Sequence, residues 1–367
     1  MSLKSIPLQK IHENLGAKMV PFAGYLMPVR YSSDLEEHLC IRQNVGVFDV
    51  SHMGEFIIEG PGALDLIQRV SANDAAKLVD GKVQYSYLPN QTGGVVDDLL
   101  VYKMGEEKYM LVVNASNIEK DWDWISQFNV SHVKMTNVSS DTCLFALQGP
   151  KSVSVLSSLV DSDKLDLGSM EYYSFKMSDI GEVKDVIISA TGYTGAGGFE
   201  LYVSENQAET LWNLLFEAGK DYGILPVGLG ARDTLRLEMG YCLYGNDITD
   251  ETSPIAAGLG WVTKFTKEFT NSDVLLEQKK AGVSQKLVGL LMDEKGIPRS
   301  HYKISDEEGN EIGEITSGTI SPVLSKGIAL GYVKTEFSSV GQVVYVKVRD
   351  KLLKANVVKL PFVGKTV

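Results

Sequence analysis

An α+β fold that ends in a small β-barrel is predicted by two patterns along the chain. In the first part, a strand, a Gly-Pro turn and an amphipathic helix follow one another twice, with further strands between them. Such repeats are typical of an α+β core built from related subdomains. Beyond about residue 285, apolar and polar residues alternate in short segments separated by glycine turns. Short alternating strands of this kind are typical of a small barrel.

The repeated units and two further segments predict the helices. Residues 56–61 lead into a helix at 63–70, and residues 144–150 lead into a helix at 153–160, each with proline near the first helical turn. Apolar residues at helical spacing predict two more helices, at 119–128 and 204–220. In the second of these, a serine followed three residues later by glutamine has the pattern of a capping box.

The barrel is expected to contain five or six short strands. Five of them are predicted by period-two alternation, at 287–292, 311–317, 328–333, 343–348 and 352–359. A tight turn at 349–351 joins the last two. Because the composition becomes polar and lysine-rich between residues 265 and 285, we expect the chain to divide into residues 1–275 and residues 276–367.

Composition and charge narrow the functional class. A chain of 367 residues that is 44% hydrophobic and 22% charged is typical of a soluble globular protein of two or three domains. No run of 18 apolar residues predicts a membrane span, no secretory signal is recognisable, and a net charge of −12 argues against nucleic acid as a partner. Cys40, Cys143 and Cys242 are widely spaced, which favours a reducing compartment, the cytoplasm, over a disulfide framework or a metal site.

A glycine-rich segment, residues 191–200 (TGYTGAGGFE), ends in a carboxylate. Its glycines would let the backbone approach a flat ligand, and Glu200 could accept two hydrogen bonds from an amidine-like N–H edge such as that of a pterin or guanine. The spacing fits neither a phosphate loop nor a dinucleotide fingerprint. On shape alone, a glycine-rich hairpin between two strands is the favoured interpretation.

Two adjacent carboxylates, Asp97 and Asp98, lie on a strand expected at 95–102. Since side chains alternate along a strand, one of them should face the interior with Leu99 and the other should face away. A pair that shares one proton is therefore not expected. The inward carboxylate is either structural or catalytic, and the residues alone favour the structural role.

Two arginines, Arg232 and Arg236, stand four apart on an expected helix and so share one face. They could be surface residues neutralised by neighbouring acids. Alternatively, Arg232 could point into a cleft and bind an anionic or carbonyl group with its planar fork.

Six segments, taken together, resemble the signature of the folate-dependent aminomethyltransferases, the T proteins of the glycine cleavage system. The segment 191–200 matches the family pattern T-G-Y-T-G-x-x-G-x-E. The other matches, in the family's order, are 48–53 (FDVSHM), 93–99 (GGVVDDL), 228–238 (GLGARDTLRLE), 244–247 (YGND) and 316–322 (TSGTISP). They extend over nearly the whole chain.

The resemblance implies a fold and an activity. The fold is a three-domain cloverleaf around a central folate cavity, with a C-terminal β-barrel. The activity moves the aminomethyl carbon from the lipoyl arm of H protein to tetrahydrofolate and releases ammonia. Tetrahydrofolate would be a co-substrate and lipoylated H protein the partner, and neither a metal nor a covalent enzyme intermediate is implied.

The resemblance also implies roles for particular residues. Asp97 matches the catalytic aspartate, Glu200 would hold the amino edge of the pterin, and Arg232 would contact folate, while Arg236 is expected to be structural. Lining of the folate pocket is implied for Tyr85, Tyr193, Met53 and Asn114, of which the last two are the weaker matches.

The chain departs from the family in two places. Ala196 stands where most members have Glu, and residues 362–367 lack a tyrosine that reaches folate in many members. We expect Ala196 to lie at the solvated tip of a turn, so that its substitution would have little effect.

Two other functions stay open. One is a folate-dependent demethylase of the same fold. The other is a non-enzymatic folate-binding relative that assists iron–sulfur cluster assembly and carries a K-G-C-Y-x-G-Q-E motif. Here residues 240–247 (GYCLYGND) keep the cysteine but lack the lysine and the glutamine.

Overall fold

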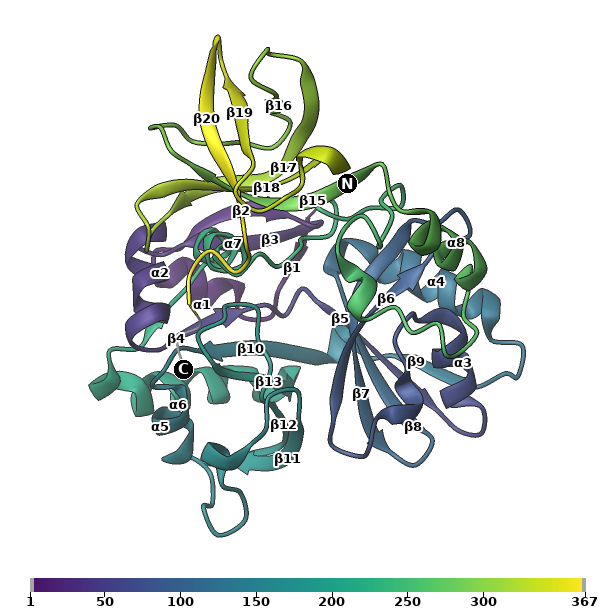
Figure 1. The fold of residues 1–367 in the computed structure, drawn as a ribbon. Coiled ribbons are helices and arrows are strands. Elements are labelled where there is room, and N and C mark those ends of the chain that lie inside the picture. Colours follow the sequence, from purple (N-terminus) through teal and green to yellow (C-terminus); the bar gives the residue numbers. More distant parts are fainter. Residues whose placement is uncertain (1–2, 365–367) are drawn as a thin grey trace.

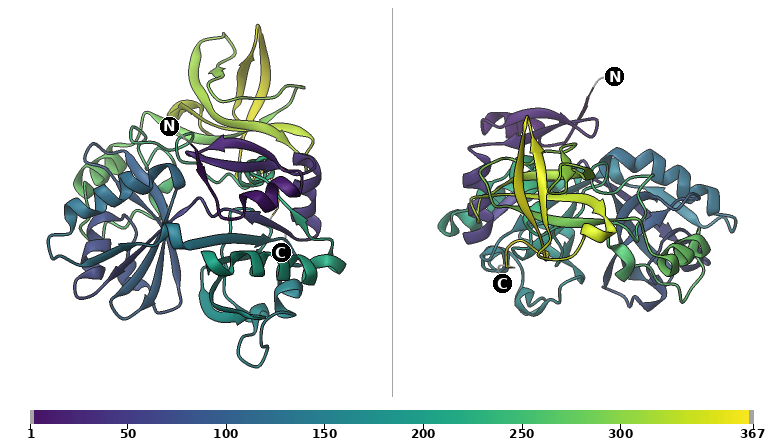
Figure 2. Two further views of the ribbon diagram at one scale, coloured as in Figure 1. Left: turned by 180° about the vertical axis from the view of Figure 1, so that it is seen from behind. Right: turned by 45° about the horizontal axis from the view of Figure 1, so that its top comes forward.

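Two large sheets and a barrel form three lobes in the computed structural model, which describes residues 3–364 (Figure 1). A short N-terminal sheet lies between the barrel and the six-stranded sheet, as the views from the front and from behind both show (Figure 2). The predicted cloverleaf with a C-terminal barrel is confirmed. No helix among the described residues is long and apolar enough to span a membrane.

The six-stranded sheet has the order β11-β12-β13-β10-β4-β14. Its strands are β4 (Gly46–Asp49), β10 (Thr142–Gln148), β11 (Phe175–Ile180), β12 (Val183–Ser189), β13 (Gly198–Ser204) and β14 (Leu225–Pro226). The chain leaves this sheet after β4 and returns to it with β10, so the second lobe is inserted between two neighbouring strands. Helices α5 (Ser152–Ser157) and α6 (Ala208–Gly219) contribute apolar residues to its core.

The inserted lobe is a five-stranded sheet of order β6-β7-β8-β5-β9. Its strands are β5 (Gly54–Glu59), β6 (Val83–Pro89), β7 (Val95–Gly105), β8 (Lys108–Val113) and β9 (Lys134–Asn137). Helices α3 (Ala63–Val70) and α4 (Ile118–Phe128) share a core with Leu99 and Val101 of β7. The alternate residues Leu100 and Tyr102 pack instead into a core shared with the six-stranded sheet. The two faces of β7 therefore meet different surroundings.

The N-terminal elements and one central helix connect the lobes. These elements are β1 (Lys4–Ser5), α1 (Gln9–Asn14), β2 (Lys18–Phe22), β3 (Tyr25–Arg30), α2 (Asp34–Gln43) and α7 (Leu229–Glu238). Helix α7 packs against α2, β3 and two barrel strands. Arg236 of this helix donates to Asp247 at 2.7 Å and to Ser317 of the barrel at 2.8 Å, which ties the helix to the barrel.

The C-terminal lobe is a closed six-stranded barrel of order β15-β18-β17-β16-β19-β20. Its strands are β15 (Gln285–Met292), β16 (Lys303–Ser305), β17 (Glu311–Ser321), β18 (Lys326–Lys334), β19 (Val343–Val348) and β20 (Lys351–Val358). Five of these strands were predicted, and the one that was not is β16, which is only three residues long. The predicted division after residue 275 falls within α8 (Ser272–Ala281), and the place where the two parts separate stays a prediction.

The helices expected at 153–160 and 204–220 differ in detail from those observed. The first ends earlier, because α5 runs only from Ser152 to Ser157. The second begins with a 3-10 turn, Glu205–Gln207, before α6. Ser204 makes no capping bond to the backbone. Instead, the Gln207 side chain donates to its hydroxyl at 2.9 Å, so the predicted capping box does not form.

Candidate active site

A cavity of about 530 Å³ opens where the two sheets, α7 and the loop after it meet. This volume lies within the usual range for a small-molecule site. Six of the residues singled out in the sequence line it: Met53, Tyr85, Asn114, Tyr193, Glu200 and Arg232. Asp98 lines it as well, and Asp97 does not.

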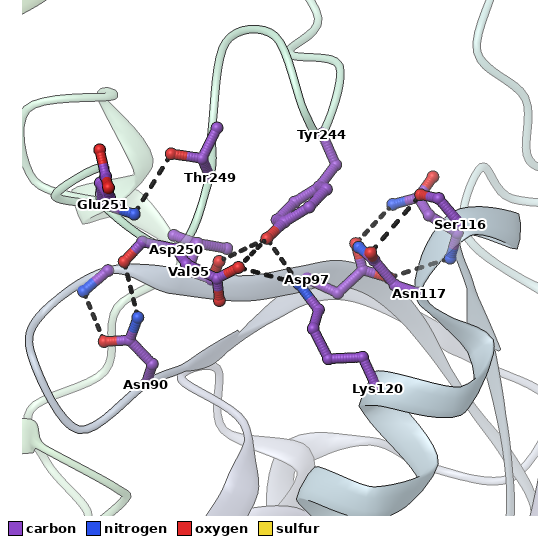
Figure 3. A network of polar contacts seen from close by, with 12 residues as sticks. Asn90, Val95, Asp97, Ser116, Asn117, Lys120, Tyr244, Thr249, Asp250 and Glu251 are labelled. Atoms are coloured by element: carbon purple, nitrogen blue, oxygen red, sulfur yellow. Dashed lines mark hydrogen bonds and ion pairs between the residues drawn. The ribbon is translucent and has the colours of Figure 1, made fainter. Parts of the chain in front are cut away.

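Asp97 is fully buried beneath the cavity wall. It faces the same side of β7 as Leu99, as the alternation predicts, but that side is the one covered by α4. Its carboxylate accepts hydrogen bonds from the Asn114 backbone at 3.0 Å and from the Asn114 side chain at 2.9 Å. A third bond comes from the Asn117 side chain at 2.7 Å (Figure 3). Asp97 therefore does not line the cavity, unlike its neighbour Asp98, and its catalytic role stays a prediction.

Asp98 is the carboxylate of this strand that lines the cavity. Tyr85 donates its hydroxyl proton to Asp98 Oδ2 at 3.0 Å, and Asn114 Nδ2 donates to Oδ1 at 2.9 Å. Burial, followed by the negative charge of Asp97, raises the pKa of Asp98 to about 7. The Asn114 side-chain amide thus lies between the two carboxylates, which agrees with the expectation that they do not share a proton.

Glu200 reaches the cavity from β13 of the other sheet. It is 8% exposed, and the Thr191 hydroxyl donates to its Oε2 at 2.5 Å. Burial raises the pKa of Glu200, whereas the Thr191 hydrogen bond and the Arg232 charge oppose that rise. One oxygen is thus held by the protein, and the side chain is oriented before any ligand arrives.

The glycine-rich loop before Glu200 folds back against β10. A Cβ at position 198 would lie 2.3 Å from the Leu147 carbonyl oxygen, so only glycine fits there. Ala196 is 1% exposed and packs in the core between the two sheets. Its expected place at a solvated turn tip is therefore wrong: the loop tip is tucked inward.

Arg232 enters the cavity from the first turns of α7. Within residues 3–364 its guanidinium has no hydrogen-bond acceptor, and its Cζ lies 4.9 Å from the centre of the Tyr193 ring. The Tyr193 hydroxyl donates to the Cys242 carbonyl, and this ring also stacks on Tyr241 at 5.6 Å. Burial lowers the pKa of Arg232. A desolvated cation with free donors is suited to bind an acceptor-rich ligand.

Arg236, one turn further along α7, has a different environment. It donates to Asp233, Asp247, Ser317 and the Tyr241 carbonyl. The expectation that it is structural is confirmed.

Tyr244 and Trp261 are among the aromatic residues that line the cavity without having been singled out individually. Tyr244 belongs to the matched segment 244–247. Its hydroxyl accepts from Lys120 at 2.7 Å and lies 3.0 Å from Asp250 and 3.1 Å from the Val95 carbonyl (Figure 3). Trp261 is 64% exposed and stacks on Tyr85 with ring centres 6.0 Å apart, so it lies where the cavity opens to solvent. No motif in the sequence marks Trp261.

The barrel contributes little to the cavity beyond Leu287 and the segment that follows the last strand, where Leu360 lies. Of the C-terminal residues in which a folate-contacting tyrosine is missing, 365–367 lie outside the described part of the chain. Among the described residues, His, Cys, Asp and Glu side chains form no group of three or more suited to hold a metal ion.

Comparisons with known proteins agree with this architecture. The family model described as the GCVT N-terminal domain matches residues 8–267, and the model described as the glycine cleavage T-protein C-terminal barrel domain matches residues 285–364. The chain is 58% identical over 363 residues to an aminomethyltransferase of Flavobacterium psychrophilum, covering 99% of this chain and 100% of that one. It is 53% identical over 362 residues to one of Bacteroides fragilis, covering 98% and 99%.

A solved structure is also similar. The glycine cleavage system aminomethyltransferase T of Bartonella henselae superposes with a TM-score of 0.92 at 35% identity, covering 99% of each chain. Both family models, in chain order, and relatives matched from end to end lead to one assignment. The chain belongs to the aminomethyltransferase family, the T proteins of the glycine cleavage system.

Proposed function

We propose that this protein transfers the aminomethyl carbon carried on the lipoyl arm of H protein to tetrahydrofolate, releasing ammonia and dihydrolipoyl H protein. The observation that carries the proposal is the placement of Asp98, Glu200 and Arg232 from two sheets and one helix around a single cavity. A flat ligand with a polar edge, such as a pterin, would meet the carboxylate of Glu200, the guanidinium of Arg232 and the carboxylate of Asp98.

We assign the catalytic role to Asp98 rather than Asp97. The aminomethyl carbon becomes cationic, with iminium character, as its bond to sulfur breaks, and a nearby carboxylate stabilises that charge. The same carboxylate can orient or deprotonate the attacking folate nitrogen, a task for which a pKa near the working pH is favourable. Asp98, with its pKa raised to about 7, meets both requirements and faces the cavity.

The binding roles follow from the donors and acceptors. Glu200, held by Thr191, would accept hydrogen bonds from the amino edge of the pterin, and Arg232 would donate to polar atoms of folate. Tyr85, Tyr193, Met53 and Asn114 would complete the pocket. Holding the folate nitrogen against the methylene carbon would supply much of the acceleration, because it replaces a bimolecular encounter.

We place the protein in the cytoplasm, where its three free thiols would stay reduced.

The experiment is release of ammonia from aminomethylated H protein by the full chain. We expect rapid release with tetrahydrofolate, formation of 5,10-methylenetetrahydrofolate in equal amount, and much slower release without folate. Sarcosine or dimethylglycine in place of the H-protein adduct tests the demethylase alternative. Turnover of these amines, with none of the H-protein adduct, would overturn the proposal.

A further inference from the structure

A third carboxyl group, Asp121 of α4, lies behind Asp97. It is fully buried. No nitrogen or hydroxyl group in residues 3–364 donates a hydrogen bond to either of its oxygens, and the partner within hydrogen-bonding reach is the carboxylate of Asp97. Two carboxyl groups in such contact cannot both be ionised without strong repulsion.

The charged groups around Asp121 do not favour a second anion. Asp97 faces it from β7, and the negative charge of Asp98, on the other side of the same strand, adds to the repulsion. On its own helix, Lys120 is the nearest cation, but its ammonium is engaged by Tyr244 and Asp250 on the surface side. A buried carboxylate without donors or a cation is strongly destabilised, so the site favours one shared proton.

The hydrogen bonds indicate which group holds that proton. Asp97 accepts three N–H bonds, two from Asn114 and one from Asn117, and is therefore set up as the anion. Asp121 accepts none, but as a neutral acid it can donate its O–H to Asp97. Burial, together with the charge of Asp97, raises the pKa of Asp121 well above its ordinary range. Burial raises the pKa of Asp97 too, but the bonds from Asp121, Asn114 and Asn117 oppose that rise.

We propose that Asp121 is a positioning residue: a neutral carboxylic acid whose O–H bond to Asp97 fixes Asn114 and, through its amide, the catalytic carboxylate of Asp98. The inference rests on the proposed function in so far as Asp98 is the working group. The chain of contacts runs from Asp121 to Asp97, then through Asn114 Nδ2 to Asp98 Oδ1, with 2.9 Å on each side of that nitrogen.

A neutral Asp121 also limits the charge behind the active site. One negative charge, on Asp97, already contributes to the raised pKa of Asp98. A second negative charge, on Asp121, would raise the pKa of Asp98 further and leave Asp98 protonated at neutral pH. Hydrogen bonding by an uncharged acid satisfies Asp97 without that effect.

The direct test is infrared spectroscopy of the full chain at pH 8 with ¹³C-labelled aspartate. We expect a protonated-carboxyl C=O band that disappears in Asp121→Asn. The matched control is Asp123→Asn on the exposed face of the same helix, which should keep the band. A spectrum in which Asp121→Asn removes no such band would overturn the proposal, whatever the enzyme's activity.

Kinetics test the link to Asp98. Asp121→Leu removes the donor and should lower kcat by about tenfold or more with little change in KM for folate, as expected for lost positioning. The amide of Asp121→Asn can donate to Asp97, so it should recover most of that loss and leave the acidic limb of the pH profile in place. A shift of that limb to lower pH in Asp121→Asn would mean that a negative charge was removed, and would refute the proposal that Asp121 is neutral.

If the infrared band behaves as expected but Asp98→Asn is fully active, the role of Asp98 fails and the protonation of Asp121 stands.

Discussion

Asp98 of the five-stranded sheet and Arg232 of α7 line the same cavity, but the protein holds their side chains in different ways. Asp98 is held on both oxygens, by Tyr85 and by Asn114. Arg232 lies over an aromatic ring and keeps its donors free. The group that would act on the reacting atoms is thus fixed in advance, whereas the group that would bind awaits acceptors from the ligand. Arg236, one turn away and fully bonded, shows how the same side chain serves structure instead.

The largest expected effect separates the two arginines. Arg236→Ala should lower the free energy of unfolding by about 3–5 kcal/mol, because it leaves Asp247 as a buried, unpaired charge. Arg232→Ala should leave stability within about 1 kcal/mol and weaken folate binding by about 1.5–3 kcal/mol instead. Urea unfolding and calorimetric titration of both variants measure this. Equal destabilisation by the two substitutions would show that Arg232 has a structural role as well.

Asp98→Asn should lower turnover by about a hundredfold, the usual scale for a lost acid–base or electrostatic group, and change folate affinity only a few fold. The wild-type kcat/KM should fall as the pH drops below about 7, because Asp98 must be ionised to act and its raised pKa lets it take up a proton there. In the Asp98→Asn variant, this fall of kcat/KM at acidic pH should disappear. A matched Asp97→Asn variant that is well folded, equally inactive and similarly altered in its pH profile would return the catalytic role to Asp97.

Glu200→Gln exchanges an anionic acceptor pair for one acceptor and one donor. We expect folate affinity to fall by about 1.5–3 kcal/mol, the range for hydrogen bonds to charged groups, with unfolding unchanged. An unaltered dissociation constant in calorimetry would remove Glu200 from the binding site.

The smallest effect concerns the loop before Glu200. Ala196→Glu inserts a long side chain into a packed core and should cost about 1–3 kcal/mol of stability. Ala281→Glu, at the exposed end of α8, is the control and should change stability by less than about 0.5 kcal/mol. If the two variants melt alike, the loop tip is solvated after all.

The fold was largely predictable because its signals are periodic. Alternation and Gly-Pro turns predicted the strand–helix units and five barrel strands, while β16, with three residues, is too short to show a period. The site was predictable only in part. Alternation correctly placed Asp97 on the face of Leu99, but which face meets a cavity is decided by the six-stranded sheet, far away in the sequence. The burial of Ala196 depends on the same contact between sheets.

Trp261 has a practical consequence. The chain has four tryptophans. Trp122, Trp124 and Trp212 belong to the hydrophobic cores of the two large lobes, and Trp261 alone among them lines the cavity. Its indole is exposed and stacked on Tyr85, so a molecule entering the opening changes its polarity and ring contacts. The protein therefore carries its own optical reporter. Intrinsic fluorescence, compared between the native chain and Trp261→Phe, can follow occupancy of the site in real time without a label.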